Sequence, residues 1–292
     1  MTIETNIPLQ WNGNLQELAY GQEKVKRLLL TSDKPVIAVK TPQGTGFTQD
    51  TTAVGTEGHQ ILAFLPTLEI GQFGDPNFLS EYGVKAAYYV GAMANGIASA
   101  EMVIALGKAG LMGSFGAGGL SPARVEAAIQ QIQTALPEGP YLFNLLHNPY
   151  EPSLEKAVVD LYLKYGITAV EAAAYVLPSE SLVYYRVMGL SQLPDGSIRI
   201  GNRVLAKISR REVAQKFLSP APERMLKRLL NKGLITPEQA EMARRVPLAD
   251  DISAEADSGG HTDNRPLVGL LPSMIAMRDE MQAKYQFNTP VR

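Results

Sequence analysis

The C-terminal two thirds of the chain alternate between short apolar segments and amphipathic segments that carry helix-capping residues. The apolar segments are nearly continuous in Ala, Val, Leu and Tyr, which is typical of parallel strands covered by helices on both faces of a sheet. The first five begin about 25 to 35 residues apart, a spacing that suits strand–helix units. The predicted strands are residues 84–93, 110–115, 141–146, 168–174, 203–209 and 251–257.

Two α/β folds fit this alternation, a doubly wound Rossmann sheet and a (β/α)8 barrel. Six strand–helix units that repeat in one direction favour the TIM-type barrel. In that fold the functional residues lie at the C-terminal ends of the strands.

Three segments depart from the alternation. Turn signals at Asp195-Gly196 and Gly201-Asn202 predict a small hairpin before the fifth strand. Residues 218–247 predict a helical hairpin inserted into the barrel, whose second helix has its N-cap at Thr236. Residues 1–82 predict a separate N-terminal α+β element, with strands at 34–40 and 59–66 and a glycine-rich turn between them.

Composition excludes several classes of function. A net charge of −2 over 292 residues provides no field that would gather nucleic acid or anionic lipid. The absence of cysteine excludes a disulfide scaffold, a thiolate nucleophile and a Cys-ligated metal. The first eleven residues lack the basic and apolar regions of a signal peptide, so we expect a cytoplasmic protein without a membrane anchor.

Glycine-rich segments follow the first two predicted strands. Residues 91–99, GAMANGIAS, and residues 113–122, GSFGAGGLSP, could let a flat or anionic ligand approach the backbone. Tight turns before helices would have the same composition, so both interpretations remain open.

Polar residues within apolar strands are the next candidates. Asn144 requires a buried hydrogen-bond partner, which could be a ligand or a neighbouring backbone group. Glu171 and Lys207, on different strands, could form an ion pair inside the barrel. Alternatively, the charge of Lys207 could face an electron-accepting ring.

The sixth strand leads into the segment EADSGGHTDNRP, residues 255–266. Gly259 and Gly260 could present backbone N–H groups to a phosphate, and His261 could transfer a proton near neutral pH. A metal site built from His261 with Asp257 and Asp263 is disfavoured, because closely spaced acids around glycines are common turn formers.

Four segments together resemble the FMN-dependent barrels of the nitronate monooxygenase (2-nitropropane dioxygenase-like) group. Within that group they most resemble the trans-acting enoyl reductases of polyunsaturated-fatty-acid and polyketide synthases, the PfaD type. The segments are GAMANGIASAEMVIALGKAGLMGSFGAGGLSP, FNLLHNPYEPSLE, VLAKISRREVA and EADSGGHTDNRP.

The resemblance implies an FMN-binding barrel that uses NADPH to reduce the α,β-double bond of an acyl chain carried by an acyl carrier protein. It implies His261 as the catalytic proton donor facing the substrate. A homodimer is also compatible with it. The residues that it places at the cofactor are Met93, Ala94 and Asn95 along the isoalloxazine, Asn144 and Lys207 at the flavin ring, and Gly259 and Gly260 on the phosphate side.

The family pattern continues with a seventh strand and an eighth, whereas this sequence reaches Arg292 where the seventh would begin. We therefore expect the first six barrel strands and the start of the seventh, from a fragment, a truncated product or a barrel completed by a separate half. Two other functions remain open: a nitronate-oxidising flavin oxidase, and an inactive half-barrel that serves as an assembly module.

Overall fold

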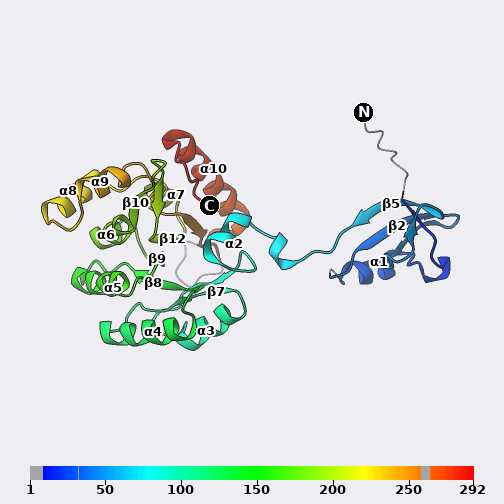
Figure 1. Cartoon of the computed structure of the whole chain (residues 1–292), viewed down its shortest axis with the longest axis horizontal. Coiled ribbons are helices and arrows are strands. Elements are labelled where there is room, and N and C mark those ends of the chain that lie inside the picture. The colour runs from blue at the N-terminus through cyan, green and yellow to red at the C-terminus, as the bar shows by residue number, and fades with distance from the viewer. Residues whose placement is uncertain (1–8, 32, 258–263) are drawn as a thin grey trace. The chain divides into compact units, whose positions relative to one another are not determined.

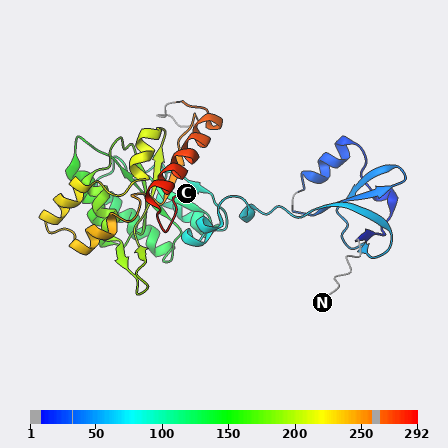
Figure 2. The ribbon, with the colours of Figure 1, turned by 90° about the horizontal axis from the view of Figure 1, so that it is seen from above.

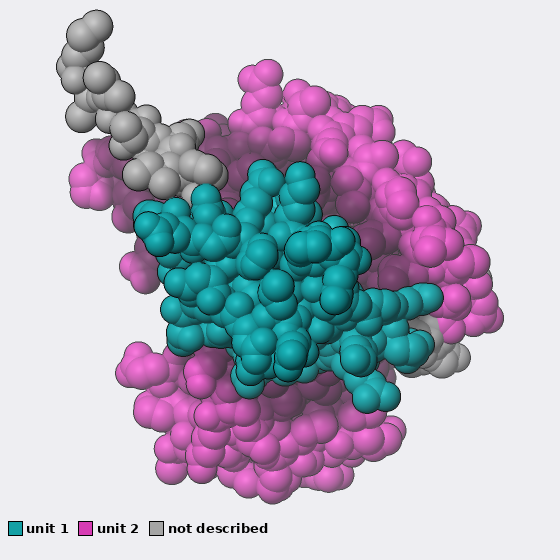
Figure 3. Space-filling model, turned by 90° about the vertical axis from the view of Figure 1, so that its right-hand side faces the viewer, with its two compact units in different colours: residues 1–76 teal, residues 77–292 magenta. Residues whose placement is uncertain are grey.

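A computed structural model describes residues 9–31, 33–257 and 264–292. The chain folds as two compact units, Met1–Pro76 and Asn77–Arg292, which are coloured separately in Figure 3. Each unit has its own buried core.

The described residues of the first unit form a small antiparallel sheet and one α-helix, α1 (Gln22–Leu29). Its core contains Trp11, Leu18, Ile37 and Val39. The sheet has the order β3-β2-β5-β1-β4, with β1 at Gln10–Trp11, β2 at Val36–Thr41, β3 at Gly44–Thr48, β4 at Val54–Gly55 and β5 at His59–Leu65.

The two strands predicted in this unit are present as β2 and β5, but the prediction of a simple glycine-rich turn between them was wrong. The turn itself comprises only residues 42–43. Residues Gly44–Thr48 form strand β3, which pairs antiparallel with β2. Gly44 has a φ of 113°, which glycine adopts more readily than other residues. This conformation lets the chain reverse direction within two residues.

The second unit contains a six-stranded, all-parallel sheet in the order β13-β12-β9-β8-β7-β6. The strand order follows the chain without the reversal that defines a Rossmann sheet, so the sheet is an α/β half-barrel, as the sequence predicted. Its strands are β6 (Tyr89–Val90), β7 (Met112–Phe115), β8 (Leu142–Leu146), β9 (Ala169–Ala173), β12 (Arg203–Ile208) and β13 (Asp251–Ala254).

Helices cover the outer face of this sheet, and Figure 1 shows α3 to α6 as an arc outside the strands. Side chains such as Phe143, Val170 and Val204 are fully buried between the sheet and these helices. The helices are α3 (Ala100–Lys108), α4 (Pro122–Ala135), α5 (Pro152–Lys164), α6 (Glu180–Met188), α7 (Arg211–Phe217) and α10 (Leu267–Tyr285).

On strands β7, β8, β9 and β12, the inner face of the sheet changes from apolar to polar along the strand. Near the strand N-termini, Met112, Leu142, Ala169 and Leu205 form a separate cluster. Aromatic and aliphatic side chains of helix α2 (Pro76–Tyr82) pack against it. Because side chains alternate between faces, the inner residues two positions further along are Ser114, Asn144, Glu171 and Lys207. Apolar side chains thus fill much of the N-terminal end of the half-barrel, where the buried Asp251 of β13 also bonds to Tyr82 and Arg292. The polar residues of the four preceding strands lie toward the C-terminal end.

The first barrel strand is much shorter than predicted, with two residues rather than ten. Before this strand, Lys85 N–H still donates to Gly110 O of the neighbouring segment at 2.8 Å. The backbone then bends before it reaches Tyr89. After the strand, the loop from Gly91 leaves the sheet and bonds to the loop that follows β7.

Both predicted insertions are present. Strands β10 (Leu190–Gln192) and β11 (Ile198–Ile200) pair antiparallel, and Figure 2 shows their hairpin, in yellow-green, projecting from the unit. Helices α8 (Glu223–Asn231) and α9 (Pro237–Ala243) form the helical hairpin. The side chains of Thr236 and Gln239 form the expected capping box at the start of α9.

The last residue lies beside the outer edge of β13. Arg292 N–H donates to Asp250 O at 3.0 Å, and Ile252 N–H donates to Arg292 O at 2.7 Å. This is the bonding pattern of a parallel ladder. The predicted start of the seventh strand therefore occupies the next position in the sheet.

No helix within the described parts of the chain is long and apolar enough to cross a membrane.

Candidate functional site

The two glycine-rich segments of the sequence pack against each other at the C-terminal edge of the sheet. Asn95 N–H donates to Gly118 O at 2.7 Å, and Gly96 N–H donates to Gly116 O at 2.9 Å. A Cβ at Gly116 would lie 1.8 Å from Met93 O, far inside contact distance. Glycine is therefore required at position 116 for the loops to approach each other.

The first of these loops presents Met93, Ala94 and Asn95 to solvent, and the Met93 side chain is 44% exposed. Asn95 has a φ of 58°, in the left-handed region that Asn tolerates better than most residues. The loop backbone is thus held in a fixed conformation while its outer surface stays open. A planar ligand could lie against such a surface.

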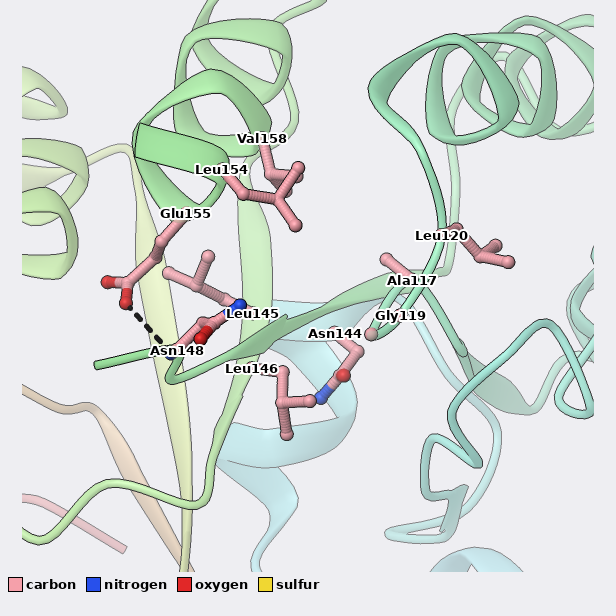
Figure 4. A pocket seen from close by; sticks show the side chains of 11 residues that line it. Ala117, Gly119, Leu120, Asn144, Leu145, Leu146, Asn148, Leu154, Glu155 and Val158 are labelled. Carbon is pink, nitrogen blue, oxygen red and sulfur yellow. Dashed lines mark hydrogen bonds between the residues drawn. The ribbon is translucent and has the colours of Figure 1, made fainter. Parts of the chain in front are cut away.

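Asn144 lies on the inner face of β8 and is buried. Its Nδ2 donates to Glu171 O at 3.2 Å, so a backbone group supplies the partner that the sequence required. Figure 4 shows Asn144 and Leu146 beside the loop that carries Gly119, where they line a small cavity of about 40 Å³. Asn144 joins β8 to β9 just below this loop.

Glu171 is fully buried on β9, and its carboxylate reaches two other parts of the site. Its Oε2 accepts a hydrogen bond from Ala92 N–H at 2.9 Å, immediately before Met93. Its Oε1 lies 3.7 Å from Lys207 Nζ on β12. The predicted Glu171–Lys207 pair therefore exists inside the half-barrel.

Lys207 also contacts a second acid, since its Nζ lies 3.2 Å from Glu255 Oε1. The Lys207 side chain is 21% exposed, so its ammonium group is not sealed off within the sheet. Glu255 N–H donates to Ile208 O at 2.9 Å, which carries the β12–β13 pairing one residue past the strand. The segment that begins the predicted His261 motif thus starts next to Lys207.

Several polar residues of the inner face were missed by the sequence prediction, among them Tyr89 and Ser114. Burial, followed by the negative charge of Glu171, raises the pKa of the Tyr89 phenol and so favours its protonated form further. Ser114 is fully buried on β7, and its Oγ has no hydrogen-bond partner among the described residues. Neither residue type is unusual in an apolar strand, so only their positions on the inner face could have identified them.

A second polar cluster lies behind β8, toward the helices. The buried Glu155 on α5 accepts hydrogen bonds from Tyr175 Oη at 3.0 Å and from Ser179 Oγ. His147 places its Nδ1 3.1 Å from Glu155 Oε2 and stacks on the Tyr175 ring. This cluster fastens α5 and α6 to the ends of β8 and β9.

Three predicted site residues, Gly259, Gly260 and His261, lie outside the described residues. The remaining five are Met93, Ala94, Asn95, Asn144 and Lys207. Contacts with Glu171 connect them: its side chain reaches Ala92 and Lys207, and its backbone carbonyl accepts from Asn144.

This part of the site fits a flavin in its chemistry. It offers an open backbone loop for a flat ring, an amide side chain beneath that loop, and a lysine charge at the C-terminal end of the strands. Glu171 Oε1, fully buried, has no hydrogen-bond partner among the described residues, although buried polar atoms usually have one.

Both units match proteins whose names refer to a fatty acid synthase or to polyketide biosynthesis. Residues 11–67, within the first unit, match the family described as the fatty acid synthase subunit PfaD N-terminal domain. One polyunsaturated fatty acid synthase subunit of Thraustochytrium sp. (strain ATCC 26185 / S-3) is 47% identical over 270 residues, which cover 92% of this chain and 18% of that protein. The polyketide biosynthesis protein PksE of Bacillus subtilis (strain 168) is 47% identical over 220 residues, which cover 75% of this chain and 29% of that protein.

Among solved structures, the enoyl reductase domain of MlnA, from the macrolactin biosynthesis cluster of Bacillus amyloliquefaciens, matches with a TM-score of 0.74 and 40% identity. The match covers 77% of this chain and 51% of that chain.

These matches confirm the resemblance to the PfaD-type enoyl reductases that the sequence motifs indicated. The chain spans less than a third of the length of either curated relative.

Proposed function

We propose that this chain forms the FMN-binding part of a trans-acting enoyl reductase. In this proposal, NADPH supplies the electrons, and the substrate is an α,β-unsaturated acyl chain carried by an acyl carrier protein of a polyunsaturated-fatty-acid or polyketide synthase. The observation that carries the proposal is the joining of Met93–Asn95, Asn144 and Lys207 around one buried carboxylate at the C-terminal edge of the half-barrel. The names of the similar proteins support the choice of reaction and of pathway.

FMN, when bound, would supply the hydride-transfer chemistry that side chains lack. The chain's own residues would hold and polarise it. The open loop at Met93, Ala94 and Asn95 would lie along the ring, and Lys207 would place a positive charge near the edge that gains electron density on reduction.

Reduction of the double bond also requires a proton at the α-carbon. His261 remains the proposed donor, since an imidazole can hold a proton near neutral pH. The segment that leads to it starts at Glu255, beside Lys207. Gly259 and Gly260 remain the proposed contacts to the phosphate.

The proposal is tested by supplying the purified protein with FMN, NADPH and a crotonyl group on an acyl carrier protein. We expect NADPH oxidation that is matched by formation of the saturated butyryl product. No turnover with this substrate, together with oxygen uptake on a nitronate, would instead identify a nitronate oxidase. No reaction in either assay by a protein that binds no FMN would favour an assembly module.

A further inference from the structure

Glu171 connects two groups that the proposed function assigns to the flavin. Its Oε2 accepts from Ala92 N–H at 2.9 Å, and this bond fixes the loop that begins one residue later. Its Oε1 faces Lys207 Nζ at 3.7 Å. The carboxylate therefore extends from β9 to the loop after β6 and also faces the lysine of β12.

The surroundings of this carboxylate are unusual for a structural ion pair. Glu171 is fully buried, yet its Oε1 makes no hydrogen bond within the described residues. Its counter-ion is shared, because Lys207 lies closer to Glu255, at 3.2 Å. Burying a charge with incomplete hydrogen bonding is costly, so a role in the site explains this arrangement better than stability alone.

The three charges have different effects on a flavin ring at this edge. Lys207 would favour the electron-rich reduced ring, and each carboxylate beside Lys207 would weaken this effect by neutralising part of its charge. Of the two acids, Glu171 is the one that also bonds the loop on which the ring would lie. Its removal should therefore alter both the affinity for FMN and the ease with which FMN is reduced.

We infer that Glu171 is a positioning residue that anchors the flavin-contacting loop through Ala92 N–H and sets the reduction potential of the flavin through Lys207. The inference rests on the proposed function, since it assumes that FMN binds at this edge. Glu171 lies beneath the residues that are predicted to contact the flavin and is not one of them.

Two substitutions separate the two roles. Glu171→Gln keeps an oxygen that can accept from Ala92 N–H but removes the negative charge, whereas Glu171→Ala removes both. Glu255→Gln is the matched control, because it removes the other acid beside Lys207 and leaves the Ala92 contact intact.

FMN affinity of the flavin-free protein tests the anchoring role. We expect Glu171→Ala to weaken FMN binding at least tenfold, and Glu171→Gln and Glu255→Gln to stay within about threefold of the wild type. Wild-type affinity in Glu171→Ala would overturn the anchoring role.

The potential of the bound flavin tests the second role, which a purely structural residue would not affect. We expect Glu171→Gln to favour two-electron reduction by about tenfold, which is a rise of about 30 mV. In a Lys207→Gln background the same change should have less than half of that effect, because Glu171 acts through Lys207. An unchanged potential in Glu171→Gln, or an equal effect in both backgrounds, would overturn this role.

Hydrogen exchange distinguishes failure of this inference from failure of the proposed function. A wild-type chain that binds no FMN contradicts the proposed function. The amides of residues 91–97 can still be compared without flavin, and they should exchange faster in Glu171→Ala than in Glu171→Gln. Equal exchange in the two variants would show that Glu171 does not anchor this loop.

Discussion

At the scale of single residues, two buried ion pairs of the second unit have different roles. The Glu171–Lys207 pair lies at the polar end of the half-barrel, with one carboxylate oxygen unsatisfied. The Arg186–Asp250 pair lies behind the sheet and is fully satisfied, with two bonds between the side chains, at 2.6 and 3.0 Å, and others to the backbone. Incomplete satisfaction therefore separates the proposed functional pair from the structural one.

Arg186→Met should destabilise the fold strongly, because it leaves Asp250 buried without its counter-ion. We expect a loss of about 3 kcal/mol in the free energy of unfolding, measured by urea denaturation. Lys156→Met, which breaks the exposed Lys156–Asp160 pair, should change it by less than about 0.5 kcal/mol. Equal effects of the two substitutions would contradict the structural role of the Arg186 pair.

Asp251 should make stability depend on pH. Burial raises the pKa of its carboxyl, against the opposing hydrogen bond and charge of Arg292. The folded protein therefore holds this proton to higher pH than the unfolded chain does. The contribution of Asp251 is thus fully present below its unfolded pKa, near 4, and is lost as pH rises through the raised value.

The check is urea denaturation of the wild type and Asp251→Asn at several pH values from 4 upward. The stability of the wild type relative to Asp251→Asn should decrease as pH rises. A constant difference in stability, or one that increases with pH, would show that burial does not raise the pKa of this carboxyl.

At the scale of elements, the site depends on two loops that must come very close together. Gly116→Ala would place a Cβ 1.8 Å from Met93 O, so one of the loops would have to move. We expect a destabilisation of about 1–3 kcal/mol and weaker FMN binding. The measurements are urea denaturation and FMN titration.

Gly91→Ala is the matched control for this substitution. Its added Cβ would meet its nearest neighbour, Glu171 Oε1, at 3.7 Å, which is an ordinary contact distance. We expect near-wild-type stability. If Gly116→Ala were tolerated as well as Gly91→Ala, the close approach of the loops would not be essential.

Much of the element order could be predicted from the sequence because its signals are local. The six strands, the β10–β11 hairpin and the capping box at Thr236 each follow from patterns within a few residues. The two-residue β6 and the strand β3 could not be predicted in this way. Their extents depend on pairing with β7 and β2, which are brought beside them only by folding.

Three polar residues of the candidate site also carry a local signal in the sequence. Asn144, Glu171 and Lys207 stand out as polar residues in apolar strands, and the structure connects them. The contact of Glu171 with Ala92 could not be predicted, because it involves a backbone N–H that any residue type would provide. To predict that Tyr89 and Ser114 belong to the site, one would have to know which face of each strand is the inner one.

At the scale of the whole molecule, the two units have separate cores, and the described residues of the proposed flavin site belong to the second. A protein comprising residues 77–292 should therefore fold and bind FMN with an affinity within about threefold of that of the full chain. Circular dichroism and FMN titration of the two proteins provide the check. Loss of FMN binding by a folded 77–292 protein would show that residues 1–76 contribute to the site.

The proposed function requires that this half-barrel bind FMN at the C-terminal edge of its strands. The most direct measurement is a titration of the purified 292-residue protein with FMN, followed by the flavin absorption and fluorescence. We predict saturation at one FMN per chain, with binding weakened by Gly116→Ala and little affected by Gly91→Ala. A protein whose folded state is verified, but which causes no change in the flavin spectrum at any concentration, would contradict the proposed function.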